Sequence, residues 1–519
     1  MVVPSKRIER LPGFRARFLR LLSAADDFAF LRMLWTLNAL QTGRSAVAGR
    51  FLNDYPPDAA TDGILGPHAI YPWELETLAN EILTTPKSIF QTFDCRNWNA
   101  IGDLINLLRS IEGAEYLARR QDVNILVELG RIGARQFPWQ RGYVGLPPLY
   151  RSAFIYGQGE CAAYLKQAAN LTVADLTLVG FAMFSVFCAE PTTCPATDLE
   201  LLHEWGISRD TLEQTLKRVS CPIAVARSCA SELRAMDIAS AYKPSILRRY
   251  PCLVDSPRKR RMIAPLPDLI MDRVTNGLFY DVVGGGGTVR DEVGRRFESY
   301  ALDLLTQMLP TAEFEQESHY RTPLGPIATP DILINDRQGA TSLAIECKAS
   351  RMSIAARFGE APGDDRGYDE IAKGVMQLWR FHAHSRLGLA PRRVAADVKL
   401  LILTLDEWFA GRSTIIPQII ERAHALADSS AHAINGEDRL PVAFCTISEL
   451  EDVLRTATEA SLLETVEIAS GERVGWIFSS LHQDTEAAKT EPKDYPFKEA
   501  LDDLLPWYGQ LQDLRDDEL

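Results

Sequence analysis

The chain has 519 residues, of which 46% are hydrophobic and 24% are charged, and its formal net charge at pH 7 is −13. This length exceeds what one ordinary hydrophobic core organises, so we expect two or three domains in a soluble globular protein. The acidic total argues against indiscriminate tight binding of nucleic acid, which normally requires a basic surface.

The cysteines and the apolar runs bear on location. The nine cysteines are scattered and include no C-x-x-C pair, which argues against a zinc site and predicts reduced thiols in a cytoplasmic protein. The longest apolar run, residues 176–189, is too short to span a bilayer and predicts a buried helix. The amino terminus, MVVPSKRIERLPGF, is polar and basic, so neither a secretory signal nor a membrane partner is expected.

Residues 1–283 are predicted to form a large all-helical region. Apolar side chains recur at helical spacing in four stretches, at 14–22, 30–37, 75–83 and 104–111. Prolines separate these stretches, and no fixed-period repeat supports a solenoid. We assign to this region the binding of a protein partner or of the substrate, and we leave a homo-oligomer open.

Four consecutive glycines at 284–287 then interrupt the chain. Backbone entropy makes such a run a poor secondary-structure element and a good joint, so we predict a linker. No G-K-[ST] follows the glycines, which argues against a phosphate-binding loop.

After the glycines the pattern changes to an alternation of helices and strands. The expected order is αβββαβ, with helix 288–308, strand 313–320, a β-hairpin over 331–348, helix 368–385, and strands 398–405 and 441–447. The hairpin prediction rests on β-prone residues on either side of the turn-forming segment NDRQG at 335–339. Residues 451–519 have a mixed pattern and end in an acidic tail, and no role is predicted for them.

The hairpin carries the residues that point to chemistry. Glu346 and Lys348 are two apart, so their side chains leave the same face of a strand, and the partner strand brings Asp331 beside them. Two acids and an ammonium on one face are costly in a fold unless a cation and a substrate use them. Magnesium takes hard oxygen ligands and suits phosphodiester hydrolysis, because it neutralises phosphoryl charge and activates water.

The segments TPDILI (329–334) and IECKA (345–349) resemble the signature of the PD-(D/E)xK nuclease superfamily, which includes restriction endonucleases. The resemblance covers about residues 288–450. It implies an α/β core like that of a restriction endonuclease, with a mixed central sheet. It also implies that Asp331 and Glu346 bind Mg²⁺, with Mn²⁺ as a substitute, and that Lys348 positions or activates the attacking water.

Two further residues match the resemblance. The run GRRFE, which ends at Glu298, is similar to the G-x-x-F-E start of such domains, so Glu298 is expected as an additional metal ligand. Glu298 borders the apolar stripe of its helix, whereas Glu292 is expected to point further towards solvent. Gln377 resembles a glutamine that some branches carry on the following helix, where it would fix the site or touch phosphate. Phe381 stands where those branches have a tyrosine.

Structural roles compete with these assignments. Asp331 also suits the start of a strand, Glu346 and Lys348 a surface ion pair, Glu298 a helix flank and Gln377 a polar helix position. His382 and His384 are two apart, which separates them by roughly 200° on a helix and argues against joint metal binding. A cluster of basic residues favours a solvated loop over a docking site for the substrate; its members are Arg248, Arg249, Arg258, Lys259, Arg260 and Arg261.

We therefore expect a metal-dependent nuclease, with DNA favoured over RNA as the substrate and endonucleolytic cleavage favoured. The resemblance associates such chains with defence against foreign DNA, including antiviral defence, or with repair. Two alternatives stay open: a catalytically silent member of the nuclease fold that serves as a binding or assembly module, and an RNase.

Overall fold

The computed structural model describes residues 6–60, 66–119, 125–255, 261–359, 365–409 and 415–517. They form two compact units in an α+β fold with mixed sheets. Unit 1 comprises 1–123, 135–284 and 501–519, and unit 2 comprises 124–134 and 285–500. The chain passes from unit 1 to unit 2 after Gly284, within the glycine run, whereas the grouping of 124–134 and of 501–519 was not foreseen.

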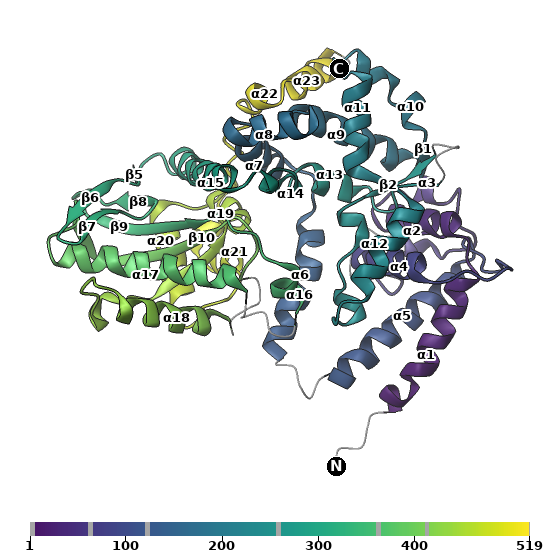
Figure 1. Cartoon of the computed structure of the whole chain (residues 1–519), viewed down its shortest axis with the longest axis horizontal. Helices are drawn as coiled ribbons and strands as arrows, with labels where there is room; N and C mark the ends of the chain where they lie inside the picture. Colours follow the sequence, from purple (N-terminus) through teal and green to yellow (C-terminus); the bar gives the residue numbers. More distant parts are fainter. Residues whose placement is uncertain are drawn as a thin grey trace. The chain divides into compact units, whose positions relative to one another are not determined.

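Unit 1 is mainly helical (Figure 1), and the four predicted helical stretches are confirmed. Its helices are α1 (Lys6–Ser23), α2 (Asp27–Gln41), α3 (Ser45–Ala48), α4 (Pro72–Thr84), α5 (Trp98–Arg119), α7 (Leu146–Tyr156), α8 (Gly159–Ala169), α9 (Val173–Ala189), α10 (Pro195–Asp198), α11 (Arg209–Val219), α12 (Ile223–Arg234), α13 (Asp268–Val274), α14 (Leu278–Val282), α22 (Leu501–Leu504) and α23 (Pro506–Asp517). Helix α6 (Ile125–Arg141) is divided between the two units.

Helix α9 corresponds to the long apolar run. Thr172 begins it with a capping box, in which the Thr172 side chain accepts from the backbone N–H of Asp175 and the Asp175 carboxylate accepts from the N–H of Thr172. Among the described residues no single helix has both the length and the apolar character that crossing a membrane requires. Helices α8 and α9 meet that requirement only as a pair, and they are bent by 69° where they join.

The expectation of an all-helical region over 1–283 is wrong in one respect, because unit 1 contains a small four-stranded sheet. Its strands are β1 (Thr192–Thr193), β2 (Ser220–Pro222), β3 (Cys252–Val254) and β4 (Met262–Ile263), in the order β1-β4-β3-β2. Strands of two or three residues are too short to show the alternation by which a strand is recognised in a sequence.

Unit 2 is built on a five-stranded mixed sheet in the order β11-β10-β9-β8-β5. The strands are β5 (Glu313–Gln316), β8 (Ile332–Asn335), β9 (Thr341–Lys348), β10 (Val394–Thr404) and β11 (Val442–Thr446). Strands β5, β8 and β9 are antiparallel neighbours, whereas β9, β10 and β11 run parallel.

The predicted hairpin over 331–348 is confirmed as β8 and β9. Its turn forms because the Asp336 carboxylate accepts hydrogen bonds from the backbone N–H groups of Gln338 and Ala340, and because Gly339 adopts a φ of 75°. A second hairpin, β6 (His319–Thr322) with β7 (Gly325–Ala328), is inserted between β5 and β8 and was not predicted.

Helices cover both faces of the five-stranded sheet (Figure 1). On one face α17 (Arg366–Arg386) and α18 (Ile415–Ser429) pack over Leu333, Ala344, Leu400 and Ile402 in one apolar core. The helices that contact the strands from elsewhere in unit 2 are α15 (Gly287–Met308), α19 (Ile447–Leu454), α20 (Glu459–Ser470) and α21 (Phe478–His482). The short helix α16 (Ile354–Phe358) lies between β9 and α17 in the chain.

The glycine run is more ordered than the linker predicted for it. Val283–Gly285 form a 3-10 turn, and α15 begins at Gly287. Gly286, with a φ of 86°, adopts the left-handed backbone that favours glycine. Part of the run therefore starts the first helix of unit 2.

Candidate metal and catalytic site

Two acidic residues meet where strands β5 and β8 part. In the antiparallel register Gln316 pairs with Ile332, so the next positions, Glu317 and Asp331, face each other. The backbone N–H of Glu317 donates to the carbonyl oxygen of Asp331 at 2.9 Å, which fixes this juxtaposition. Opposed residues on neighbouring strands project to the same side, so both carboxylates leave the same side of the sheet.

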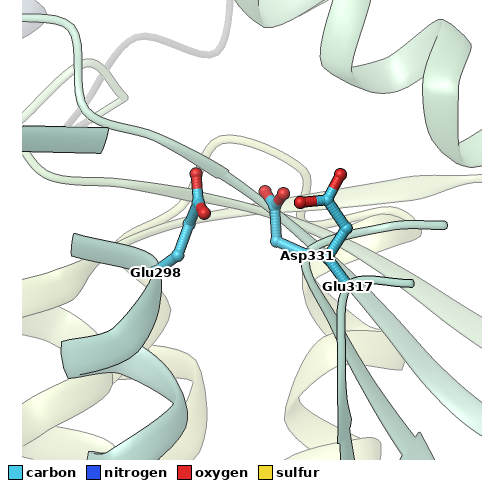
Figure 2. A group of neighbouring side chains, drawn as sticks. All are labelled: Glu298, Glu317 and Asp331. Carbon is cyan, nitrogen blue, oxygen red and sulfur yellow. The ribbon is translucent and has the colours of Figure 1, made fainter. Parts of the chain in front are cut away.

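Glu298 completes a group of three acids from helix α15. One carboxylate oxygen from each of Glu298, Glu317 and Asp331 lies within 4.8 Å of the others. Figure 2 shows Glu298 rising from its helix and the other two rising from neighbouring chain segments, with all three carboxylates turned to the same side. Sequence reasoning missed Glu317. Pairing the first predicted strand with the strand of Asp331 would have found it.

Glu346 and Lys348 lie next to this group on β9. Ile345 pairs with Ile332, which puts Glu346 opposite Asp331 at the following position, and the backbone N–H of Cys347 donates to Asp331 Oδ2 at 2.6 Å. The structure does not place Glu346 in the three-acid group. Instead its Oε1 accepts a hydrogen bond from Lys348 Nζ at 2.6 Å.

The second oxygen of Glu346 is the unusual one. Glu346 is only 2% exposed, and its Oε2 is buried without a hydrogen-bond partner among the described residues. A buried carboxylate oxygen without a partner carries a free-energy penalty of about 1–3 kcal/mol. Such an atom indicates a ligand that binds there.

Helix α17 closes the site over the Glu346–Lys348 pair. A Cβ atom on Gly374 would lie 2.9 Å from Lys348 Cε and 3.2 Å from Glu346 Cγ, so any other residue there would have to displace the pair. Gln377 follows one turn later on the same helix and is part-exposed. The structure thus brings Gln377 near the site through its helix, without a hydrogen bond to the acids among the described residues.

Burial and neighbouring charges raise the pKa of three acids of the site, Asp331, Glu298 and Glu346. Burial, followed by the charges of Glu346 and Glu298, raises the pKa of Asp331 to about 8. Burial likewise raises the pKa of Glu298, with further contributions from Glu317 and Glu346. Burial raises the pKa of Glu346 as well, although Lys348 opposes the shift. Like charges at this density favour protonation or a bound cation.

Lys348 stays protonated in these surroundings. Burial alone would lower its pKa, but the charges of Glu346 and Asp331 and the hydrogen bond to Glu346 outweigh it, so the pKa is raised. At neutral pH the side chain is therefore an ammonium ion that donates hydrogen bonds and cannot accept a proton.

The donor set fits a hard divalent cation. All candidate ligand atoms are carboxylate oxygens, which Mg²⁺ prefers, and Mg–O bonds of about 2.1 Å hold ligand oxygens up to about 4.2 Å apart. One carboxylate oxygen from each of the three acids lies within 4.8 Å of the others, which is close to that span. Glu298, Glu317 and Asp331 would hold the ion, and the unpartnered Oε2 of Glu346 supplies a further acceptor at its side.

The expectation for Glu292 is wrong. Glu292 is 5% exposed and forms ion pairs with Arg295 at 2.8 Å and Arg296 at 2.9 Å. Arginines one turn along α15 compensate its buried charge, which a hydrophobic stripe alone does not reveal.

The two histidines of α17 have separate neighbours, as their spacing predicted. His382 Nδ1 lies 3.6 Å from Asp438, whereas His384 Nδ1 and the Tyr320 hydroxyl share a hydrogen bond of 2.9 Å. His384 Nε2 also lies 3.2 Å from His432 Nδ1.

The described members of the basic cluster have partners within the protein. Arg248 donates to Glu76 from two nitrogens, and Arg261 pairs with Asp255 at 2.7 Å. The guanidinium of Arg249 lies over the ring of Tyr250. Arg258, Lys259 and Arg260 lie outside the described residues.

Comparison of the chain with protein-family models, with curated proteins and with solved structures finds no match.

Proposed function

We propose that unit 2 is a Mg²⁺-dependent phosphodiesterase, most simply a DNA endonuclease of the PD-(D/E)xK type with a restriction-endonuclease-like core. One observation carries the proposal: three carboxylates gather beside a buried Glu346–Lys348 pair whose glutamate has an unpartnered oxygen. Acids placed together at a free-energy cost indicate a site selected for binding a cation rather than for stability.

The residues divide the work between them. Asp331, Glu317 and Glu298 would hold Mg²⁺, which supplies charge neutralisation at the phosphoryl oxygens and a more acidic water. In the hydrolysis, a water oxygen attacks phosphorus and a P–O ester bond breaks, and the leaving oxygen takes up a proton. The Lys348 ammonium donates hydrogen bonds, so its role is to orient the attacking water and to stabilise negative charge on the phosphoryl group.

Glu346 has two roles in this scheme. Its Oε1 accepts the hydrogen bond that positions Lys348. Gly374 has no side chain, which lets α17 pack closely against the pair. Its Oε2 is available as an acceptor for the attacking water or as a further ligand. Gln377, one turn beyond Gly374, would contact phosphate or support the site.

The proposal is tested by cleavage assays with Mg²⁺ and with Mn²⁺ on plasmid, linear duplex and single-stranded DNA and on RNA. We expect cleavage of DNA by the wild-type chain, and at least a roughly 100-fold loss in Lys348→Ala and in Asp331→Asn, the scale seen when a single charge-stabilising group is removed. Lys373→Ala is the matched control, because Lys373 lies on α17 but pairs with Glu370 at the surface.

The possible outcomes distinguish the proposed nuclease from a non-catalytic module and from an RNase. Equal cleavage by the wild type, Lys348→Ala and Asp331→Asn would exclude this site as the source of activity. Binding of nucleic acid without any cleavage would favour the non-catalytic module, and cleavage of RNA alone would make the enzyme an RNase. A cytoplasmic location and a role in defence or repair stay predictions.

A further inference from the structure

Arg380 is a part-buried arginine of unit 2 that has no acidic partner among the described residues. Its Nε is buried without a hydrogen-bond partner, and no ion pair joins its guanidinium to an acid among the described residues. Its neighbours in sequence and fold behave differently: Arg386 pairs with Asp438, Arg422 with Asp369 and Arg439 with Asp428. A part-buried guanidinium with an orphaned donor indicates a missing anion.

Arg380 lies on α17, the helix that packs against the Glu346–Lys348 pair of the site. Gly374 contacts Glu346 and Lys348, and His384 contacts Tyr320. Arg380 lies between these two contacts, about 9 Å along the helix axis from Gly374 and about 6 Å from His384, from the rise of 1.5 Å per residue. It also follows Gln377 by three residues, so both side chains project from neighbouring positions on the helix surface.

The electrostatic neighbours agree with this placement. Burial raises the pKa of Glu346, and Lys348 and Arg380 oppose the shift. Burial lowers the pKa of His384 to about 4, with contributions from His432 and Arg380, and burial and Arg380 together lower the pKa of His432. The charge of Arg380 therefore acts on two histidines with lowered pKa values and on a glutamate that already accepts a hydrogen bond from Lys348.

We propose that Arg380 binds a phosphate of the nucleic-acid backbone next to the one that is cut, so that substrate, rather than protein, supplies its missing anion. The inference rests on the proposed function and extends it to a positioning subsite on α17. A guanidinium suits this role because its planar fork of donors matches two phosphate oxygens at once.

The test measures DNA binding separately from cleavage. Dissociation constants are determined by fluorescence anisotropy with short labelled duplex and single-stranded DNA, in Ca²⁺ in place of Mg²⁺, from about 50 to about 200 mM KCl, the range over which phosphate contacts show their salt dependence. We expect Arg380→Gln to weaken binding about tenfold and to reduce the slope of log K against log salt by about 1. Arg380→Lys should retain the slope and recover only part of the affinity, because the charge stays and the fork is lost.

Arg422→Gln is the matched control, since it removes the same charge from α18 but breaks a surface pair with Asp369. Its affinity and salt slope should equal those of the wild type. A thermal melt of each variant separates misfolding from lost binding, and a purely structural role for Arg380 would change the melt but leave the slope intact. Tight wild-type binding with an unchanged slope in Arg380→Gln would overturn this inference alone, whereas absence of wild-type binding and cleavage would overturn the proposed function with it.

Discussion

Buried acids are compensated in opposite ways in unit 1 and at the site of unit 2. In unit 1, acids of low exposure face arginines: Glu74 lies 2.6 Å from Arg109, Glu112 lies 2.8 Å from Arg135, and Asp281 lies 2.7 Å from Arg273. At the site of unit 2, Glu298, Glu317 and Asp331 face one another, and the one nearby lysine is held by Glu346.

This difference distinguishes charges that stabilise a fold from charges that await a ligand. A buried ion pair is compensated inside the protein, so removing either partner destabilises it. Crowded carboxylates repel one another, so removing one should relieve the metal-free protein. Four predictions follow this comparison.

The largest expected effect on stability comes from breaking a buried ion pair in unit 1. Arg273 donates to both oxygens of Asp281, and both side chains are largely buried. Asp281→Asn should lower the free energy of unfolding by about 3 kcal/mol, because Arg273 keeps a buried charge without its counter-ion. Urea denaturation measures this, with Glu213→Gln in an exposed pair as the control that should not change. A loss as small as in the control would mean that the pair is not compensating a buried charge.

At the site of unit 2 the same type of substitution should raise the free energy of unfolding instead of lowering it. The pKa of Asp331 is about 8 in the folded protein, against a usual value of 3.8, so between these pH values the folded state holds a proton that the unfolded state has released. Wild-type stability in EDTA should therefore fall as the pH rises from 4 to 8. Asp331→Asn should reduce that slope and gain about 2 kcal/mol at pH 8, because Glu298 and Glu346, whose pKa values are also raised, keep their share of it. Thermal melts across this range measure it, and a variant less stable than the wild type at pH 8 would contradict it.

Glu317 is the exposed member of the three-acid group, so its substitution tests metal binding with little effect on a buried charge. Glu317→Gln should raise the Mg²⁺ concentration for half-maximal cleavage about tenfold, which corresponds to about 1.4 kcal/mol of metal binding. Glu315→Gln, two residues earlier on β5, is the matched control, since Glu315 pairs with Arg392 at 2.8 Å. Equal magnesium dependence in both variants would remove Glu317 from the ligand set.

Gly374→Ala should have the smallest effect on stability. Its Cβ would press on Lys348 Cε at 2.9 Å and on Ile402 Cδ1 at 3.1 Å, which should cost about 1 kcal/mol because the lysine can shift. That shift should still lower the cleavage rate several-fold. Gly102→Ala, with open space around its Cβ, is the control. Full activity in Gly374→Ala would show that the Glu346–Lys348 pair tolerates displacement.

Local signals made much of unit 2 predictable. The turn at Asp336 and Gly339 with its flanking β-prone residues fixed the hairpin, and strand periodicity put Glu346 and Lys348 on one face. Glu317 could not be found in this way, because its place depends on β5 pairing with β8 across an inserted hairpin.

The remaining misses have similar causes. Strands β1 to β4 are too short to show a period, and β1 and β2 pair with β4 and β3 across long stretches of chain. The need for glycine at 374 arises from the approach of α17 to β9, which no local pattern encodes. Arg380 is an ordinary helix residue in the sequence, and only the structure shows that it lacks an acidic partner among the described residues.

The inserted hairpin β6–β7 is connected to the five-stranded sheet through Glu317, which follows β5, and through Asp331, which precedes β8. Its base is fastened by hydrogen bonds from Glu317 N to the Asp331 carbonyl, from Thr329 N to the Ser318 carbonyl, and from Ser318 N to the Thr329 hydroxyl. These bonds hold Glu317 and Asp331 in register at the base of the hairpin, and Tyr320 within the hairpin contacts His384 of α17. Under the proposed function, β6–β7 would therefore be an insertion beside the candidate ligands whose own residues supply none of them.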